Sequence, residues 1–154
     1  MPNDPFATRH GWTLYLYSAF RVPYDTLVTE VGKLAAFNPE GLATHPKAKL
    51  LKRINDLILE EIPSNPANPI FRQGSTLGTH HKDWFRAKFL GRFRMFYRYN
   101  TNAKLIIYCW VNDENTLRKS GAETDPYKLF AKMLKSGNPP NSWNDLWRTV
   151  VKGE

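Results

Sequence analysis

The chain has 154 residues, and its 22 Lys and Arg against 14 Asp and Glu give a formal net charge of +8. This length allows one domain to bury a core without disulfides or metals. The single cysteine, Cys109, excludes an internal disulfide, and no apolar run reaches the roughly 20 residues that a membrane span needs. We therefore expect one cytoplasmic domain, residues 1–154, whose partner is a nucleic acid or another polyanion.

The first half of the chain predicts a strand followed by two helices. Residues 1–10 contain two prolines and little periodicity, so we expect a flexible lead-in. Apolar and polar residues alternate from Trp12 to Tyr17, which predicts a strand. Apolar residues recur at helical spacing from Pro23 to Asn38 and again from Pro46 to Ile62, which predicts a helical hairpin. The three prolines of residues 63–71 then favour an extended connector.

Three consecutive strands are predicted between Trp84 and Val111. The segments 84–89 and 92–99 alternate in period two and are joined by a short turn, whereas 105–111 is almost continuously apolar, as in a central strand buried on both faces. Because successive side chains on a strand point to opposite faces, the first two strands gather their basic residues on one face. We call this the basic face, and its residues are Arg86, Lys88, Arg92, Arg94 and Arg98.

The basic face carries five positive charges, and no acidic residue occurs from Trp84 to Tyr99. Like charges repel one another, and a fold accepts them more readily where an anion binds. A face that is charged only for solubility normally mixes both signs. The segregation therefore favours a phosphate-binding surface, with a merely solvated face as the alternative.

Polar loops flank the predicted sheet on both sides of the hairpin. A glycine-containing loop ends in His80 and His81, which form either a rim of the site or a solvent-exposed pair. After the last strand the sequence changes abruptly to the polar residues 112–115, where loops commonly place functional groups. Arg118 and Lys119 follow and would extend a phosphate track.

The C-terminal part predicts two more helices. Asp125 and Pro126 begin one that includes Tyr127 and Leu134, and Ser142 is placed to cap the last. The order of elements indicates an α+β fold, in which the first strand and the three-strand meander form a small antiparallel sheet. With the helices packed on one face of that sheet, the basic face would remain uncovered.

Several segments resemble a known family of bacterial toxins. The order of elements is similar to the RelE and ParE toxin superfamily, and the segments DWFRAKF, GRFRMFYRY, WVNDENTLR and KMLKSGNPP resemble the YhaV family of type II toxins. The resemblance covers Gly11 to about Trp147. It implies a RelE-like fold and an endoribonuclease that cleaves messenger RNA, acts with the ribosome and inhibits translation. It also implies a cognate antitoxin similar to PrlF.

The same resemblance implies which residues act. Arg86 and Lys88 fall where RelE-like ribonucleases place catalytic lysines, and Arg94 falls where those enzymes keep an arginine. After the last strand many members of the superfamily have a basic residue or a histidine, whereas this chain has the polar residues 112–115 and only then Arg118. A late tyrosine of the superfamily matches Tyr127 loosely. Further RNA-binding candidates complete the site, namely Arg92, Arg98, His80, His81, Lys119, Asn112 and Asn115.

RNA cleavage without a metal needs a base for the 2′-hydroxyl, an acid for the leaving 5′-oxygen and positive groups on the phosphate. The planar fork of Arg94 suits the phosphate, and Lys88 is the candidate for the acid or base. Asp113 and Glu114 either share that role or fix a nearby arginine. No residues show metal-ligand spacing, so we expect no cofactor. The alternative is a toxin of the ParE type that binds nucleic acid or gyrase without cutting RNA.

Overall fold

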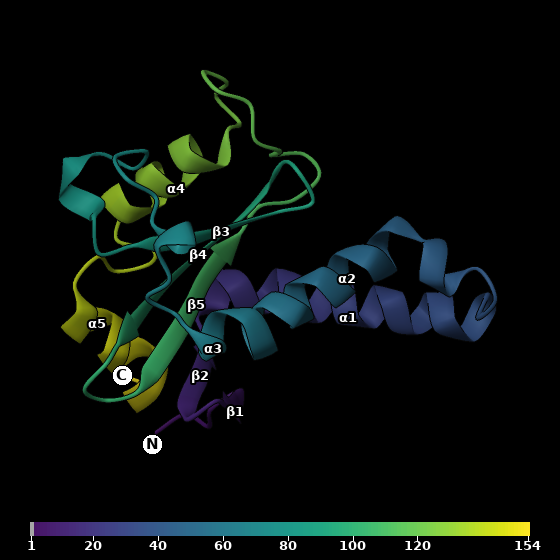
Figure 1. The fold of residues 1–154 in the computed structure, drawn as a ribbon, viewed down its shortest axis with the longest axis horizontal. Coiled ribbons are helices and arrows are strands. Elements are labelled where there is room, and N and C mark those ends of the chain that lie inside the picture. The colour runs from purple at the N-terminus through teal and green to yellow at the C-terminus, as the bar shows by residue number, and fades with distance from the viewer. Residues whose placement is uncertain (1) are drawn as a thin grey trace.

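A mixed five-stranded sheet with helices on both faces forms the centre of the molecule (Figure 1). The structure is a computed structural model and describes residues 2–154. The sheet order is β1-β2-β5-β4-β3, and β2 and β5 are parallel while the other neighbours are antiparallel. The strands are β1 (Ala7–Arg9), β2 (Trp12–Leu16), β3 (Phe85–Phe89), β4 (Phe93–Asn100) and β5 (Leu105–Val111). The predicted α+β class and the contribution of the first strand to the sheet are confirmed. The prediction that this sheet is antiparallel is wrong, because β2 runs parallel to β5.

Strand β5 is the central strand that its apolar sequence predicts. Ile106 and Tyr108 are fully buried on one face, and Ile107 and Cys109 are fully buried on the other. Each pair belongs to a different hydrophobic core, so this strand needs a cover on both sides. The helical hairpin and the C-terminal helices therefore pack against opposite faces of β5.

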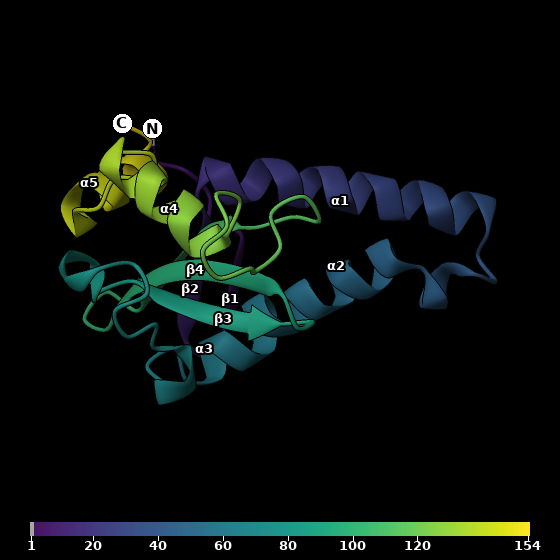
Figure 2. The ribbon, with the colours of Figure 1, turned by 90° about the horizontal axis from the view of Figure 1, so that it is seen from above.

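The helical hairpin covers one face of the sheet. It consists of α1 (Ser18–Phe37) and α2 (Pro46–Asp56), and α2 continues through a π-helical turn, Leu57–Glu61, into α3 (Ile62–Ser64). Figure 2 shows the hairpin extending well beyond the sheet. The predicted start of α1 at Pro23 is wrong, because the helix begins at Ser18. The earlier start buries Phe20, which stacks on Tyr24 with ring centroids 6.0 Å apart.

The first residues are better ordered than a flexible lead-in. Residues 7–9 form β1 and pair with β2, and Asn3 N donates to Val151 O over 2.9 Å. Phe6 packs edge-on against Tyr24. The predicted lead-in is therefore wrong from Asn3 onward, and Met1 lies outside the described residues. Both ends of the chain lie close together (Figure 1).

The C-terminal helices cover the opposite face of the sheet (Figure 2). They are α4 (Pro126–Lys135) and α5 (Trp143–Trp147), the latter continued by a π-helical turn, Arg148–Lys152. Asp125 and Ser142 cap α4 and α5 as predicted, since they accept hydrogen bonds from Tyr127 N and Asp145 N. Within residues 2–154 no helix is both long and apolar enough to cross a bilayer.

The prediction that all helices pack on one face and leave the basic face uncovered is wrong. Phe96 lies on that face of β4 and stacks on Phe130 of α4, with ring centroids 4.3 Å apart and planes 8° from parallel. Ile107 and Tyr15 extend the same apolar stripe across the sheet. Exposing this stripe to water would cost too much free energy, so α4 and α5 pack over the middle of the basic face.

Candidate active site

The basic face of β3 and β4 is divided rather than open. Arg86 and Arg94 retain only 8% and 7% of their accessible surface, and 12% of the Arg98 side chain is exposed. Lys88 is exposed, and so is Arg92, which lies in the hairpin turn just before β4. The predicted surface of five side chains converging in open solvent is therefore wrong, and two of the five are accessible.

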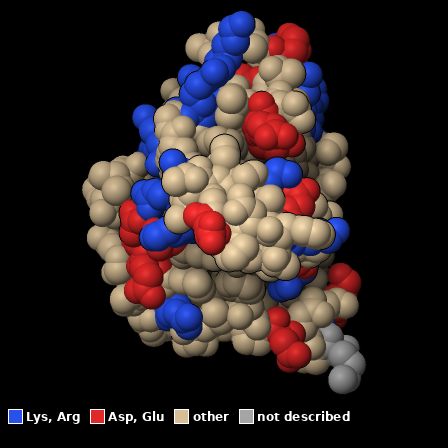
Figure 3. Space-filling model, turned by 90° about the vertical axis from the view of Figure 1, so that its right-hand side faces the viewer, with Lys and Arg blue, Asp and Glu red and all other residues tan. Residues whose placement is uncertain are grey.

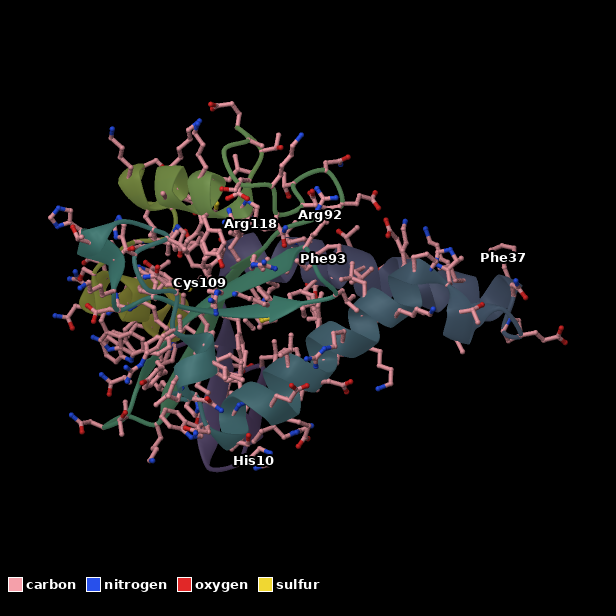
Figure 4. The ribbon with its side chains drawn as sticks, turned by 45° about the horizontal axis from the view of Figure 1, so that its top comes forward. His10, Phe37, Arg92, Phe93, Cys109 and Arg118 are labelled. Carbon is pink, nitrogen blue, oxygen red and sulfur yellow. The ribbon has the colours of Figure 1, made fainter. Side chains whose placement is uncertain are left out.

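The hairpin-turn end of the face brings several predicted residues together. Lys88 and Arg94 are direct cross-strand partners. Arg118 comes from the loop after β5, and its backbone N–H donates to Arg92 O over 2.8 Å. The Nε of Arg92 donates back to Arg118 O over 3.0 Å. Figure 4 shows Arg92 and Arg118 beside each other. We call Lys88, Arg92, Arg94 and Arg118, with Arg86 next to them, the turn-end cluster.

Asn112 attaches the loop after β5 to the sheet. Its side-chain oxygen accepts from Arg94 N over 2.7 Å, and its side-chain nitrogen donates to Thr116 O over 2.7 Å and to Arg92 O over 3.2 Å. Both ends of this buried amide are thus used within the protein. Asn112 therefore positions the cluster. Its amide, which was predicted to contact RNA, is already hydrogen-bonded within the protein.

A chain of contacts connects Arg86 to a buried carboxylate. The Nε of Arg86 donates to the hydroxyl of Tyr127 over 2.8 Å, and the guanidinium of Arg118 lies 4.7 Å from the centroid of the Tyr127 ring. Arg118 also donates to Asp125, with Nη1 and Oδ2 2.7 Å apart. Asp125 is 3% exposed and caps α4 as well. Asp125 therefore holds Arg118 over the ring of Tyr127, whose hydroxyl accepts the hydrogen bond from Arg86.

Asp125 is the site residue that sequence reasoning missed. Its place before a proline indicated a helix cap and nothing more. The same cap position also brings the carboxylate of Asp125 against the loop that carries Arg118 and Lys119. The backbone N–H of Lys119 donates to Asp125 Oδ1 over 2.8 Å. This second role depends on how the loop folds back, for which the sequence offers no periodic signal.

The turn-end cluster has a large excess of positive charge. Within the described part of the chain, Asp125 pairs with Arg118, and no carboxylate lies within 4.0 Å of Arg86, Lys88, Arg92 or Arg94. Arg94 donates through Nη1 to Gly91 O and Phe93 O, while its buried Nε has no hydrogen-bond partner among these residues. A buried cation without a counterion costs free energy. An arriving anion would offset that cost.

The surface around this end carries both signs of charge. Figure 3 shows Lys and Arg side chains toward the top of the view, the side on which the loop after β5 lies in Figure 1, with acidic side chains between them. Lys119 is exposed in that loop. The mixed surroundings contrast with the unpaired charges at the centre of the cluster.

Arg98 occupies a different environment at the far end of the basic face. Its guanidinium carbon lies 5.4 Å from the ring centroid of Trp84 and 5.9 Å from that of Trp143. It donates to Asn141 O and lies 3.9 Å from Asp83. Burial lowers the pKa of Arg98, and the carboxylate of Asp83 opposes this shift. Most of the side chain is therefore enclosed by its own fold.

The two candidate histidines belong to the Arg98 end. A ring nitrogen of His81 lies 3.0 Å from Asn141 Oδ1, which also accepts from Trp84 Nε1 over 2.8 Å. His80 is exposed in the short 3₁₀ turn Thr79–His81. The structure thus places neither histidine beside Lys88, although both lead into β3 as the sequence indicated.

The remaining residues of the loop after β5 make hydrogen bonds mainly within that loop. The carboxylate of Asp113 accepts from Asn115 N and from Thr116 Oγ1, both over 2.9 Å. Glu114 and the side chain of Asn115 are exposed. The alternative that Asp113 or Glu114 fixes an arginine is wrong, since no arginine of residues 2–154 lies within 4.0 Å of either carboxylate. Over the same residues no group of three His, Cys, Asp or Glu side chains is arranged to hold a metal.

Comparison with known proteins now identifies the family. Residues 14–151 match the YhaV toxin family, described as a toxin with endonuclease activity of a toxin-antitoxin system. The chain belongs to this family. It is 47% identical over 141 residues to "Ribonuclease toxin YhaV" of Escherichia coli strain K12, covering 90% of this chain and 92% of that protein. It is also 47% identical over 139 residues to "Toxin YhaV" of Escherichia coli O6:H1, covering 89% and 90%. No solved structure matches.

Family membership confirms the predicted resemblance and the predicted class of function. The protein is the toxin of a toxin-antitoxin system and has endonuclease activity, and such a system includes an antitoxin as its partner. The non-catalytic alternative of the ParE type receives no support. The assignment of individual site residues is a separate matter, which depends on the geometry of the turn-end cluster.

Proposed function

We propose that this YhaV-family toxin cleaves RNA at the turn-end cluster without a metal ion. The name of the relative from Escherichia coli K12 describes that protein as a ribonuclease, which supports RNA as the substrate here. The single observation that carries the site is that Arg86 and Arg94 are buried with no carboxylate within 4.0 Å in the described chain, next to exposed Lys88. A scissile phosphate supplies the missing negative charge.

Positive charge that is fixed before the substrate arrives stabilises the transition state most effectively. Arg94 is fixed by Gly91 O and Phe93 O, and Arg86 by Tyr127 and Ile70 O. From their buried positions in the sheet, these arginines stabilise the negative charge that develops on the phosphate. Arg92, Arg118 and Lys119 are accessible enough to contact neighbouring phosphates of the same strand.

The chemical step requires one proton to leave the 2′-hydroxyl and one to reach the 5′-oxygen. The 2′-oxygen attacks phosphorus, the bond to the 5′-oxygen breaks, and a 2′,3′-cyclic phosphate remains. Lys88 is the exposed group of the cluster that exchanges a proton, so we assign it to one of these two transfers. Tyr127, which is 5% exposed and bonded to Arg86, acts by positioning that arginine.

The biological substrate in this proposal is messenger RNA on the ribosome, and cleavage there inhibits translation. The antitoxin in this proposal is similar to PrlF. It inhibits by covering Lys88 and Arg92 with carboxylates, which bind the same exposed charges as the phosphates of RNA.

Mapping of RNA ends after induced expression in bacteria tests the proposal. Wild type is expected to create new 5′ ends within messenger RNA, and Arg94→Ala is expected to create none. On ribosome-free RNA the purified protein should retain cleavage in EDTA and leave a 2′,3′-cyclic phosphate, and the parallel assay with ribosomes keeps the Mg²⁺ that holds their subunits together. Intact RNA that is merely bound in a salt-sensitive manner, or cleavage that stops in EDTA, would contradict it.

A further inference from the structure

A second cationic pocket lies at the opposite end of β3 from the hairpin turn. Its walls include one arginine and one lysine from the chain before β3, one aromatic ring from β3 and the end of β4 that carries a second ring. The residues that matter here are Arg72, Lys82, Asp83, Phe85, Arg98 and Tyr99. We propose that this pocket binds one nucleotide of the RNA substrate away from the scissile phosphate. The inference rests on the proposed ribonuclease function and adds a separate subsite to it.

The charges of the pocket suit a phosphate group. Arg72 and Lys82 are both exposed, and no carboxylate of residues 2–154 lies within 4.0 Å of either. The carboxylate of Asp83 is 87% exposed and lies 3.9 Å from Arg98, which is already enclosed by two indole rings. Arg72 and Lys82 are therefore free to contact an anion from solvent.

The aromatic pair suits a nucleobase. Phe85 and Tyr99 have ring centroids 5.0 Å apart with planes at 58°, and both side chains are half-buried. Tyr99 also packs edge-on against Trp12 at 5.9 Å, so its ring is held in place. Every base has a flat face that stacks on such a ring without sequence preference. An acidic peptide would use the cations alone, and the adjacent rings therefore favour RNA.

The loop that forms one wall is fixed by a buried glutamine. The side-chain oxygen of Gln73 accepts from Leu77 N over 3.2 Å and from Thr76 Oγ1 over 2.9 Å, and its nitrogen donates to His81 O over 2.8 Å. Gly74 follows with φ of +64°, a conformation that other residues rarely adopt. The pocket wall is thus ordered before any ligand binds.

The two sites are placed for one strand of RNA. β3 is an edge strand of the sheet, Phe85 and Arg72 meet in a β-bridge at its start, and Lys88 lies near its end. The strand rises about 3.3 Å per residue, so Phe85 and Phe89 are about 13 Å apart. That separation is within the reach of a few nucleotides. Phe85 and Tyr99 lie on the helical-hairpin face of the sheet, whereas Lys88 lies on the opposite face, so the RNA would cross the free edge of β3 on its way from the turn-end cluster to the pocket.

Binding of RNA that cannot be cleaved tests the charge component. The probe is a 2′-O-methyl oligonucleotide, and the variant Arg72→Gln/Lys82→Gln is compared with Lys33→Gln/Lys49→Gln, which removes the same charge from exposed positions on the helical hairpin. We expect the slope of log affinity against log salt to fall by about 0.7 for each lost phosphate contact in the pocket variant. The control should keep the wild-type slope. Equal slopes for both double variants would overturn the proposal.

Cleavage of a length series tests the base component. Extending the RNA until it reaches the pocket is expected to raise kcat/KM for wild type and for Tyr99→Phe, which keeps the ring. In Tyr99→Leu the rise in kcat/KM on lengthening the RNA should be roughly tenfold smaller than in wild type. If wild type cleaves RNA but Tyr99→Leu gains as much as Tyr99→Phe, the subsite is wrong while the function stands. Wild type that cleaves no RNA refutes the function itself. If the charge variant weakens binding of the antitoxin alone, the pocket belongs to that partner, and the RNA assignment fails.

Discussion

The two ends of the basic face carry the same kind of side chain in opposite environments. At the hairpin turn, Arg94 is buried beside exposed Lys88, with no carboxylate of the described chain within 4.0 Å. At the other end, Arg98 lies between the rings of Trp84 and Trp143. Phe96 separates the two ends, because its stack with α4 closes the middle of the face.

The difference teaches how to separate a functional arginine from a structural one. Alternation along a strand decides which face a side chain takes, but the elements that cover that face decide what the side chain does. One backbone carbonyl, Asn141 O, and two indole rings contact Arg98, and through Trp143 it ties α5 to β4. Arg94 also donates to two backbone carbonyls, and the buried Nε of both arginines lacks a partner among the described residues. The two arginines differ because Asp83 lies 3.9 Å from Arg98, whereas no carboxylate of residues 2–154 lies within 4.0 Å of Arg94, which pairs across the strands with Lys88.

The largest effect that tests this comparison is expected from Lys88→Met. Proton transfer by a positioned side chain contributes about 10²- to 10⁴-fold to rate. The rate of RNA cleavage should fall by a factor in that range, while the melting temperature should stay close to wild type because Lys88 is exposed. Cleavage kinetics together with circular dichroism provide the measurement. A folded Lys88→Met variant with full activity would remove lysine from the mechanism.

The next largest effect is expected from Asp125→Ala, which removes both the ion pair with Arg118 and the cap of α4. The free energy of unfolding should fall by about 3 kcal/mol. Asp125→Asn keeps a cap acceptor but loses the charge, so it should restore much of the stability. We expect kcat to be below the wild-type value in both variants, and kcat to change by a larger factor than KM. Wild-type kcat in Asp125→Asn would limit Asp125 to a structural role.

Much of this fold could be predicted from the sequence because period two and helical spacing are local signals. The strands of the meander, the helical hairpin and the caps at Asp125 and Ser142 all follow from neighbouring residues. The apolar run of β5 even implied burial on both faces. Taken together with Phe96, that run already required a second layer of helices.

The assembly of the site could not be predicted in the same way. Arg118 reaches the cluster because the loop after β5 folds back on the hairpin turn, where Asn112 holds it by hydrogen bonds to β4. Such contacts depend on tertiary geometry and leave no repeating pattern. The family resemblance indicated Arg118 and Tyr127 only loosely, and the catalytic role of each residue remains a prediction for the experiments above.

A smaller effect, on stability alone, is expected from Arg98→Ala. The substitution removes the contacts with Trp84 and Trp143 and the hydrogen bond to Asn141, and should lower the free energy of unfolding by about 2 kcal/mol. On RNA too short to reach the pocket at this end, cleavage per folded molecule should remain near wild type. Chemical denaturation and active-site-normalised kinetics measure the two quantities. A loss of activity as large as that of Arg94→Ala would show that the two ends act as one site.

The smallest effect concerns Cys109, which is fully buried in the core between the sheet and helices α4 and α5. Burial raises the pKa of this thiol above its ordinary value of 9.0, and nearby Arg98 partly opposes the shift. The unfolded chain therefore loses the thiol proton first as the pH rises, so the contribution of the thiol to stability is complete below pH 9 and declines above it.

Between pH 9 and 10 the free energy of unfolding should fall by about 1 kcal/mol because of this one group. The buried tyrosines Tyr97 and Tyr108, whose pKa values burial also raises, add their own decline only above their ordinary value of 10.0. Cys109→Ala should thus flatten the curve from pH 9 to 10 in denaturation experiments. An equal slope in both proteins would mean that the thiol meets solvent, and that the Arg98 end opens as readily as the turn-end cluster.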